Sequence, residues 1–291
     1  MDIFVQSAVY GALLGVGQGL FAVALILTFR STGFLNLSIG AVATVSAYVV
    51  WDLWSKGSVP LAVAMLVALI AAAVLGLVTE RVLRPLRSSS VVVKLVATLG
   101  AMLVVQFLVT TVWGTEESFL PLFISGGLQM GRVPLPWQQI ILAGGTVASA
   151  VALQVWVRRT TTGIASLALA EDAGAARALG IPLGRVSAAV WALSALLAGI
   201  AGLGLSSFGI LNNTEMTLSM VTALAAALIA GFENIPLAVV AAAGAGAFTA
   251  AISSISSVSH VAGLKESLGF MVVLAVIVLR PKSLGQTLGR A

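Results

Sequence analysis

Residues 33–42 read GFLNLSIGAV and stand between two long apolar runs. One Asn and one Ser therefore occupy the point where a hydrophobic chain turns. The same pattern, Gly-Phe-x-Asn followed by Leu and Ile two positions apart, returns as GFENIPLAVV at residues 231–240, which is 198 positions later. A polar turn that occurs twice predicts two related groups of segments, each built around one copy of the turn.

The composition places the chain in a membrane. Of its 291 residues, 59% are hydrophobic and only 9% are charged, and the mean hydropathy is +1.11. Soluble domains carry about 25% charged residues. Backbone polar groups in lipid must be paired within their own segment, so apolar runs this long predict helices. A β-barrel would show alternating segments of about ten residues. We therefore expect an all-α polytopic membrane protein with one transmembrane domain over residues 1–291.

Apolar length predicts about nine spans. A bilayer needs roughly 20 apolar helical residues, and the second, seventh and last segments are shorter than that. These three are either crossings or re-entrant segments, so the count lies between eight and ten. The predicted spans lie near 7–29, 37–54, 60–83, 91–113, 137–157, 186–208, 217–231, 236–255 and 266–280.

Basic residues are distributed unevenly between the two sets of turns. Twelve fall in one set and three in the other. Cytoplasmic loops are enriched in Lys and Arg, so this asymmetry predicts that the N-terminus lies outside and the C-terminus inside. The inside set is Arg30, Arg81, Arg84, Arg87, Lys94, Arg158, Arg159, Arg177, Arg185, Arg280, Lys282 and Arg290. The outside turns hold Lys56, Arg132 and Lys265, together with the acidic Glu116, Glu117 and Glu215.

A second repeated motif supports the duplication. VLRP occurs at residues 82–85 and again at 278–281, 196 positions later. Because this offset nearly equals that of the opening pattern, residues about 23–87 and about 221–283 are predicted to be two copies of one three-helix unit. Both VLRP copies fall on the inside face, which makes the repeat parallel rather than inverted. Transporters are commonly built from such repeats, and interrupted segments at matching positions point to the transported path.

Polar residues within the apolar segments are candidates to line that path, because they are costly in lipid and tend to face cavities or partners. Asn side chains donate and accept hydrogen bonds, so Asn36 and Asn234 are predicted to cap broken helix ends; the alternative is that both are ordinary turn residues at the inner surface. Polar residues deeper in the helices line the path or, alternatively, bond two helices together. The candidate set is Gln18, Asn36, Ser38, Thr98, Gln106 and Asn234.

The longest inside loop covers residues 158–185. Its middle, residues 166–179, is rich in Ala and Leu, which predicts a helix of about four turns outside the bilayer. Gly180 fits a helix stop, and Arg177 in the last turn favours the helix dipole. Glu171 and Asp172 form an adjacent acidic pair on the inside. The segment is either an interfacial connector or a docking site for another protein.

Several kinds of chemistry are excluded. The chain has no cysteine, which excludes disulfides and thiolate-bound metals. Its single histidine, His260, has no partner set for a metal or a catalytic triad. There is no P-loop, so ATP is not hydrolysed by that route in this chain. The net charge of +5 reflects inside loops rather than nucleic-acid binding. We therefore expect neither a metal site nor enzymatic activity.

A resemblance to a known family becomes specific in the loop and the helix after it. AEDAGAARALGIPLGRVSAAVWALSALLAGIAG resembles the corresponding stretch of LivH-type permeases, which are subunits of branched-chain amino acid ABC importers. RSTGFLNLSIGAVATVSAY, LVATLGAMLVVQ and LIAGFENIPLAVV are similar to other stretches of that family, in the same order. The similarity covers almost the whole chain.

The resemblance implies a partner for the loop. In that family this loop is the coupling helix that inserts into a cytoplasmic ATPase. It also implies a second permease of related sequence, two ATPase subunits that bind ATP and Mg, an external solute-binding protein and a bacterial-type cytoplasmic membrane. This chain itself is then expected to hold no cofactor. The coupling residues that the resemblance implies are Leu169, Glu171, Asp172, Ala176, Arg177 and Gly180.

Two departures from the family leave the solute open. The family usually has Asn-Phe-Ala-His-Gly at residues 36–40, where this chain has NLSIG, and the late segment departs similarly at residues 230–237. Branched-chain amino acids, other amino acids, amides, urea and small carboxylates are all compatible. The alternatives to an importer permease are an ion-coupled secondary transporter and a non-transporting scaffold. The first usually needs an ionisable residue deep in a span, and none lies clearly at mid-span here.

Overall fold

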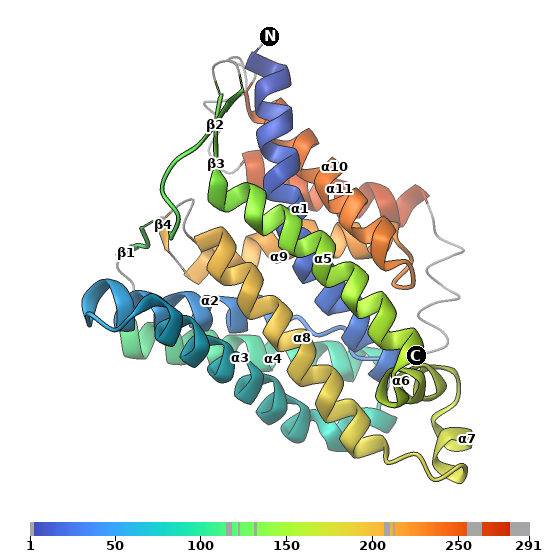
Figure 1. Cartoon of the computed structure of the whole chain (residues 1–291). Helices are drawn as coiled ribbons and strands as arrows, with labels where there is room; N and C mark the ends of the chain where they lie inside the picture. Colours follow the sequence, from blue (N-terminus) through green and yellow to red (C-terminus); the bar gives the residue numbers. More distant parts are fainter. Residues whose placement is uncertain are drawn as a thin grey trace.

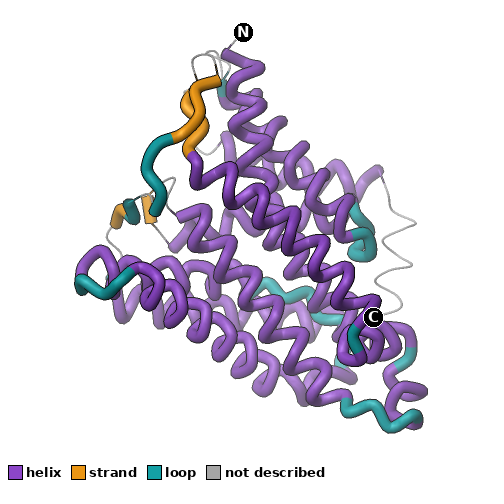
Figure 2. The backbone as a smooth tube through the Cα atoms, viewed as in Figure 1, coloured by secondary structure: helices purple, strands orange, loops and turns teal. Residues whose placement is uncertain are grey.

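The computed structural model describes residues 3–114, 118–121, 123–130, 133–206, 210–211, 213–254 and 264–279, and almost all of them are helical (Figures 1 and 2). The helices are α1 (Ile3–Thr32), α2 (Ile39–Val50), α3 (Leu61–Leu83), α4 (Val91–Trp113), α5 (Trp137–Arg159), α6 (Thr161–Glu171), α7 (Ala173–Ala178), α8 (Leu183–Ser206), α9 (Asn213–Ile229), α10 (Ile235–Ser253) and α11 (Leu264–Leu279).

The helices confirm an all-α polytopic membrane protein. Within the described residues, six helical stretches are long and apolar enough to cross a bilayer, and they contain α1, α3, α4, α5, α8 and α10. The remaining apolar helices α2, α9 and α11 have 12, 17 and 16 residues. They coincide with the three segments that the sequence predicts to be short.

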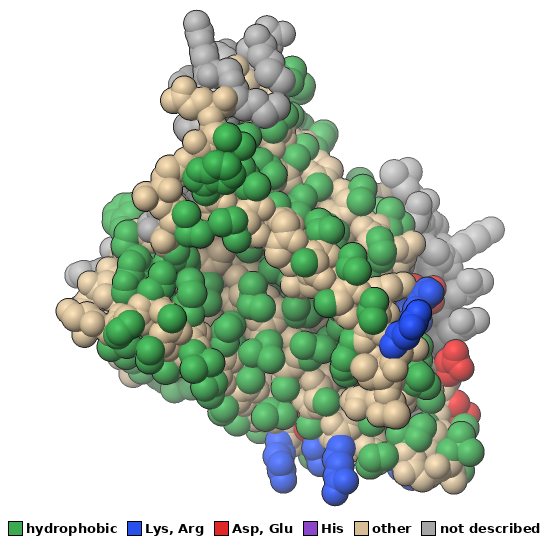
Figure 3. All heavy atoms as spheres, viewed as in Figure 1, with side chains coloured by type: hydrophobic (Ala, Val, Ile, Leu, Met, Phe, Trp, Pro, Cys, Tyr) green, Lys and Arg blue, Asp and Glu red, His purple; other side chains and the backbone are tan. Residues whose placement is uncertain are grey.

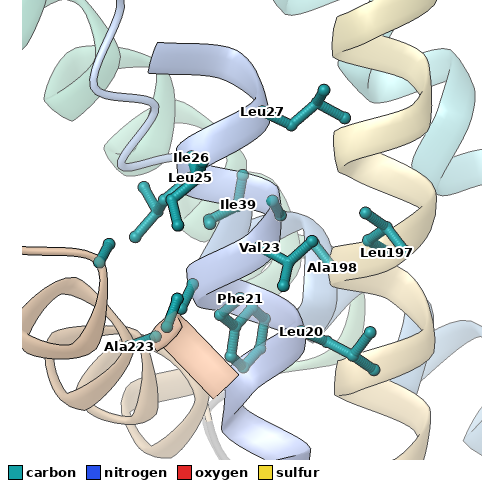
Figure 4. Close-up of a cluster of buried hydrophobic side chains, with 14 of the residues drawn as sticks. Leu20, Phe21, Val23, Leu25, Ile26, Leu27, Ile39, Leu197, Ala198 and Ala223 are labelled. Carbon is teal, nitrogen blue, oxygen red and sulfur yellow. The ribbon is translucent and has the colours of Figure 1, made fainter. Parts of the chain in front are cut away.

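Helix α1 forms the centre of the bundle. Every residue from 20 to 27 is apolar or Ala and at most 3% exposed. A helix that is apolar all round is buried on all sides, and α5, α8, α9 and α10 all pack against α1. Figure 4 shows Leu20, Val23 and Leu27 beside α8, while Phe21 and Leu25 point toward the side of Ala223 on α9.

Glycines bring α1 and α10 into backbone contact. A methyl group on Gly15 would overlap the carbonyl oxygen of Ala242, and one on Gly11 would overlap Gly246 and Ala250. Without a strong hydrophobic drive between helices in lipid, small residues permit the close approach that holds helices together. At these positions the two helices are therefore held together by close packing of their backbones rather than by large side chains.

Two glycines on α10 give a matched test of this packing. Gly246→Ala is expected to destabilise the protein by about 1–3 kcal/mol, because the new methyl group meets the backbone of α1. Gly244→Ala, whose methyl group meets nothing within 4 Å, is expected to leave stability unchanged or raise it by up to about 1 kcal/mol. Thermal unfolding in detergent measures both, and equal effects would contradict the close-packing account.

The outer helices present apolar side chains to the surroundings. Exposed large side chains follow α3 at Val63, Leu66, Ile70 and Val74, and similar residues follow α4 and α5. Figure 3 shows such side chains spread over the whole visible face, whereas Lys and Arg lie toward the end that carries α6 and α7. An apolar surface of this extent is typical of a lipid-facing protein.

Short strands that were not expected from the sequence join the helices at the end away from α6 and α7. Strand β2 (Gly127–Met130) pairs with β3 (Val133–Pro136) in an antiparallel hairpin beside the beginning of α5. Strand β1 (Ser118–Phe119) pairs with β4 (Ile210–Leu211), which links distant parts of the chain. The two-residue pairing of β1 with β4 is too short to carry a periodic signal in the sequence.

Candidate functional site

The turn between α1 and α2 contains the first candidate residues. Gly33 ends α1 with φ of 68°, a conformation that favours glycine. Asn36 is 3% exposed, and its Oδ1 accepts hydrogen bonds from the backbone N–H of Ser38 at 3.1 Å and from Ser38 Oγ at 2.6 Å. Asn36 therefore closes the turn before α2 rather than capping its first helical turn.

Helix α4 covers this turn. The buried Thr98 hydroxyl donates to the backbone carbonyl of Leu35, with an O–O distance of 2.8 Å. One turn earlier on α4, the Nζ of Lys94 lies 5.5 Å from the centre of the Phe34 ring. All three candidates, Asn36, Ser38 and Thr98, are buried, and Thr98 lies against the turn that holds the other two. We call these three residues the buried polar cluster.

The second copy of the turn lies between α9 and α10. Gly231, with φ of 63°, ends α9, and the N–H of Phe232 donates to the carbonyl of Ala227 at 3.0 Å in the usual left-handed stop. Asn234 Oδ1 accepts from the N–H of Leu237 at 3.1 Å, which confirms the predicted cap of α10. Unlike Asn36, Asn234 is exposed.

The two remaining candidates lie elsewhere in the bundle. Gln106 Nε2 donates to Thr217 Oγ1 at 2.7 Å and bonds α4 to α9. It is eight residues beyond Thr98, or roughly 12 Å along α4 at 1.5 Å per residue. Gln18 is half-buried on α1. The six candidates thus form one cluster of three with three separate outliers.

Sequence reasoning missed several polar groups that the fold buries. Gln139 on α5 is 1% exposed, and within the described part of the chain neither its amide nitrogen nor its amide oxygen has a hydrogen-bond partner. On α8, Ser187 Oγ and Trp191 Nε1 are also buried without partners. The Trp191 ring packs edge-on against Phe34, with 5.8 Å between ring centres. Only the burial of these residues distinguishes them from ordinary boundary residues, and the sequence pattern does not reveal burial.

The inside loop differs from the single helix predicted over residues 166–179. It folds as α6 and α7, which are separated at Asp172, where φ is −153° and ψ is 105°. The Asp172 carboxylate accepts from the N–H groups of Gly174 at 2.7 Å and Ala175 at 3.0 Å. The prediction was wrong because Ala and Leu propensity favoured one helix, whereas Asp is a preferred N-cap and begins a second.

The predicted end of this segment is confirmed. Gly180 has φ of 78°, its N–H donates to the carbonyl of Arg177, and the N–H of Ile181 donates to the carbonyl of Ala176. Both bonds are those of a Schellman stop. Of the six predicted coupling residues, Glu171, Asp172, Arg177 and Gly180 are exposed, Leu169 is half-buried and Ala176 is buried.

The base of this segment is anchored in the bundle. A Cβ on Gly163 would overlap the backbone of Trp156, so α6 folds back tightly on α5. Ser166 is buried, and its hydroxyl donates to the carbonyl of Gly163 at 2.6 Å. At the tip, Leu179 is 80% exposed. Figure 1 shows α7 projecting at the lower right corner of the molecule, with α6 above it in this view.

The Asp172 cap predicts a pH dependence. Hydrogen bonds from the backbone N–H groups of Ala175 and Gly174 lower the pKa of this carboxyl below its ordinary value of 3.8. The cap therefore contributes stability above that value and loses it as the pH falls through the lowered pKa. A spin label on Leu179→Cys should become more mobile on acidification. Asp172→Asn, a neutral cap, should remove the dependence; an identical titration in both would contradict the account.

Some predicted residues lie outside the described part of the chain. They are Glu116, Glu117, Arg132, His260, Arg280, Lys282 and Arg290. The second VLRP copy is likewise described only at its first two residues, and the second repeat unit only as far as residue 279.

Comparison with known proteins identifies the family. The family model described as "Branched-chain amino acid transport system / permease component" matches residues 7–280. The chain is 26% identical to the high-affinity branched-chain amino acid transport system permease protein LivH of Escherichia coli, over 96% of this chain and 94% of that protein. It is also 26% identical to the permease protein BraD of Pseudomonas aeruginosa, over 80% and 81% of the two chains.

A solved structure supports the fold. PsaBC from Streptococcus pneumoniae, in complex with Fab, aligns with a TM-score of 0.50 over 97% of this chain and 94% of that chain, at 14% identity. At this identity the likeness concerns the fold alone. The family match over nearly the full length and the apolar helical bundle agree with each other. The chain belongs to the family of permease components of branched-chain amino acid transport systems, and is a non-catalytic, multi-pass membrane subunit of an ABC transporter.

Proposed function

We propose that this permease moves a small polar solute inward by alternating access, driven by ATPase subunits bound in trans. The observation that carries the proposal is the α6–α7 segment, whose base is packed into the bundle and whose charged tip is exposed. A rigid base with an exposed tip suits the transmission of movement from another protein. ATP and Mg then belong to that partner, since this chain has no P-loop.

The contact with the ATPase is assigned to the six coupling residues. Glu171, Asp172, Arg177 and Gly180 are exposed and available to a partner, while the buried Ala176 and the half-buried Leu169 set the position of the tip. An acidic pair next to a single Arg gives the tip opposite charges a few residues apart. Such a pattern favours one orientation of docking over others.

The path for the solute is assigned to the neighbourhood of the two polar turns. Asn36, Ser38 and Thr98 form the buried polar cluster, and Gln106, Gln18 and Asn234 extend the set along α4, α1 and the start of α10. Interrupted helices are tolerated in a membrane where they line a cavity or are covered by protein. Two interrupted positions in matching places support a path near them.

The packing of the two turns supports the parallel repeat. In the first predicted unit, α1 ends in a left-handed Gly and α2 and α3 follow; in the second, α9 ends in the same way and α10 and α11 follow. The units pack reciprocally, because α1 lies on α10 and α9 lies on α2. At the contact of the two turns, the Phe29 and Phe232 rings lie 4.5 Å apart and Arg30 Nη1 donates to the carbonyl of Glu233.

Contacts between basic residues and distant loops support the proposed orientation. Arg30 reaches the turn after α9, and Arg84 reaches the beginning of α8. Residues assigned to the inside by the positive-inside rule therefore gather at the same end of the bundle. We accordingly place α6 and α7 in the cytoplasm and the β2–β3 hairpin outside.

Branched-chain amino acids are the first solutes to test, because the LivH and BraD relatives are named for them. The residues at 36–40 and 230–237 differ from the usual family pattern, so other amino acids, amides, urea and small carboxylates belong in the same screen. The proposed assembly contains a second, related permease, two ATPases and an external solute-binding protein.

Reconstitution tests this function. The chain is to be co-expressed with its candidate permease, ATPase and binding-protein partners and placed in proteoliposomes. We expect ATP-dependent accumulation of labelled leucine or of another solute in the screen, and no accumulation without the binding protein. ATP-independent uptake driven by an ion gradient would instead support a secondary transporter.

A further inference from the structure

An ionic cluster forms around one buried carboxylate at the end of α3. A 3₁₀ turn, Arg84–Ser88, continues the chain there and supplies two partly exposed arginines. The Glu80 side chain is 2% exposed. Its Oε2 accepts from Arg84 Nη2 at 2.8 Å and its Oε1 from Arg84 Nε at 3.2 Å. Arg87 also donates to Oε1. Both oxygens of one buried carboxylate are thus engaged by two guanidinium groups.

This arrangement fixes the direction of the Arg84 side chain. A buried carboxylate is unstable unless it is paired and hydrogen-bonded, so Glu80 keeps its partners. The two-point contact matches the planar geometry of a guanidinium and restricts its rotation. Arg84 therefore acts as a rigid extension of α3.

Arg84 extends from α3 to the junction of α7 and α8. Its Nη2 lies 3.5 Å from the carbonyl oxygen of Gly184, a long hydrogen bond across 100 positions of sequence. The guanidinium lies so close that a Cβ at Gly184 would be 3.2 Å from Nη1. The cluster therefore links α3 to the first turn of α8, at the C-terminal end of the proposed coupling segment.

Helices α3 and α8 are packed closely beyond this junction. A Cβ on Gly76 would overlap the Trp191 carbonyl and the Ala195 side chain, and one on Gly199 would lie 3.1 Å from the Ala72 side chain. Such contacts leave little room for the helices to slide past each other. From Trp191 onward, α8 is therefore held against α3 by packing alone.

We propose that Glu80 and Arg84 are positioning residues that lock the α7–α8 junction to α3, so that movement of α7 carries α3 and α8 as one body. This inference rests on the proposed coupling role of α6 and α7. Without the lock, the first turn of α8 and the short connection before it absorb the movement, and ATP hydrolysis proceeds without matching transport. Among the described residues, the side-chain hydrogen bonds of Glu80 and Arg84 reach only each other, Arg87 and Gly184, and none reaches a candidate path or coupling residue.

The first test measures the lock in the permease alone. The chain has no cysteine, so spin labels attach only at introduced cysteines. Val82→Cys and Leu179→Cys, both at exposed positions, provide the two labelling sites. Pulsed electron paramagnetic resonance in nanodiscs should give a narrow distance distribution in the parent chain and a broad one in Glu80→Gln. The exposed neighbour variant Arg81→Gln is the matched control and should stay narrow.

Arg84→Lys separates positioning from charge balance. Lysine keeps a positive charge beside Glu80 but lacks the planar, two-point geometry of a guanidinium group. It therefore still neutralises the Glu80 carboxylate without fixing the direction of the side chain. We expect the distance distribution of Arg84→Lys to broaden as well, with an unchanged amount of monodisperse protein. A narrow distribution in Arg84→Lys would overturn the proposal, even if Glu80→Gln failed to fold.

The second test measures coupling in the reconstituted complex. The number of ATP molecules hydrolysed per solute imported should rise severalfold in Arg84→Lys and stay at the parent value in Arg81→Gln. An unchanged ratio in Arg84→Lys would overturn the coupling role. If the parent complex showed no ATP-driven uptake, the proposed function would fail, while the distance measurement would still report on the lock.

Discussion

Reversing both charges between α6 and α7, with Glu171→Lys and Asp172→Lys, is expected to release the ATPase subunits and abolish uptake while the permease stays in the membrane. Both side chains are exposed at the tip of the segment. Placing like charges opposite each other at an interface costs several kcal/mol, which corresponds to at least a roughly hundredfold weaker association. Co-purification of the ATPases with the permease measures the association, and uptake in proteoliposomes measures its consequence.

A neutral variant separates docking from folding at this tip. Asp172→Lys also removes the cap of α7, whereas Asp172→Asn keeps an oxygen that accepts from Gly174 and Ala175. Glu171→Gln with Asp172→Asn should therefore retain α7 and lose only the charges, with a smaller loss of association. Full uptake in the charge-reversed variant would refute the assignment of coupling to this segment.

Replacing Asn36 with Leu is expected to have the second largest effect, a loss of most uptake without loss of the ATPases. The change removes the acceptor for the buried N–H and hydroxyl of Ser38. Each buried polar group left without a partner costs about 1–3 kcal/mol, so the turn between α1 and α2 loses its geometry. Uptake per unit of folded protein, with ATPase co-purification on the same sample, measures the result.

Two further variants show whether the amide of Asn36 acts on the solute or only on the turn. Asn36→Asp keeps the acceptor for Ser38 but loses the amide donor. Normal uptake in Asn36→Asp would limit Asn36 to shaping the turn, while a solute-dependent loss would support contact with the solute. Asn234→Leu should also reduce uptake, but less, because Asn234 is exposed and its side chain caps α10 by accepting the N–H of Leu237. Normal uptake kinetics in both Asn36→Leu and Asn234→Leu would show that the two residues are ordinary turn residues with no role in transport.

The elements that sequence predicted well depend on residues close together in the chain. The span predicted at 91–113 coincides with α4 (Val91–Trp113), because length and apolar composition alone define a membrane helix. The stop at Gly180 was predicted because a left-handed residue is a local requirement that glycine meets. The break at Asp172 also has a local signal, because Asp is a preferred N-cap residue. It was missed because the residues around it are mostly strong helix formers.

The contacts between helices were decided only by the tertiary structure. Thr98 bonds Leu35 across 63 positions, Gln106 bonds Thr217 across 111, and Arg84 reaches Gly184 across 100. In a chain rich in Ala, Val and Leu, many relative placements of two helices look alike in the sequence. Close packing at glycines selects one of them. The sequence by itself thus determined the membrane-spanning helices, the glycine stop at Gly180 and the family resemblance, and the packing determined which polar residues meet and which are buried.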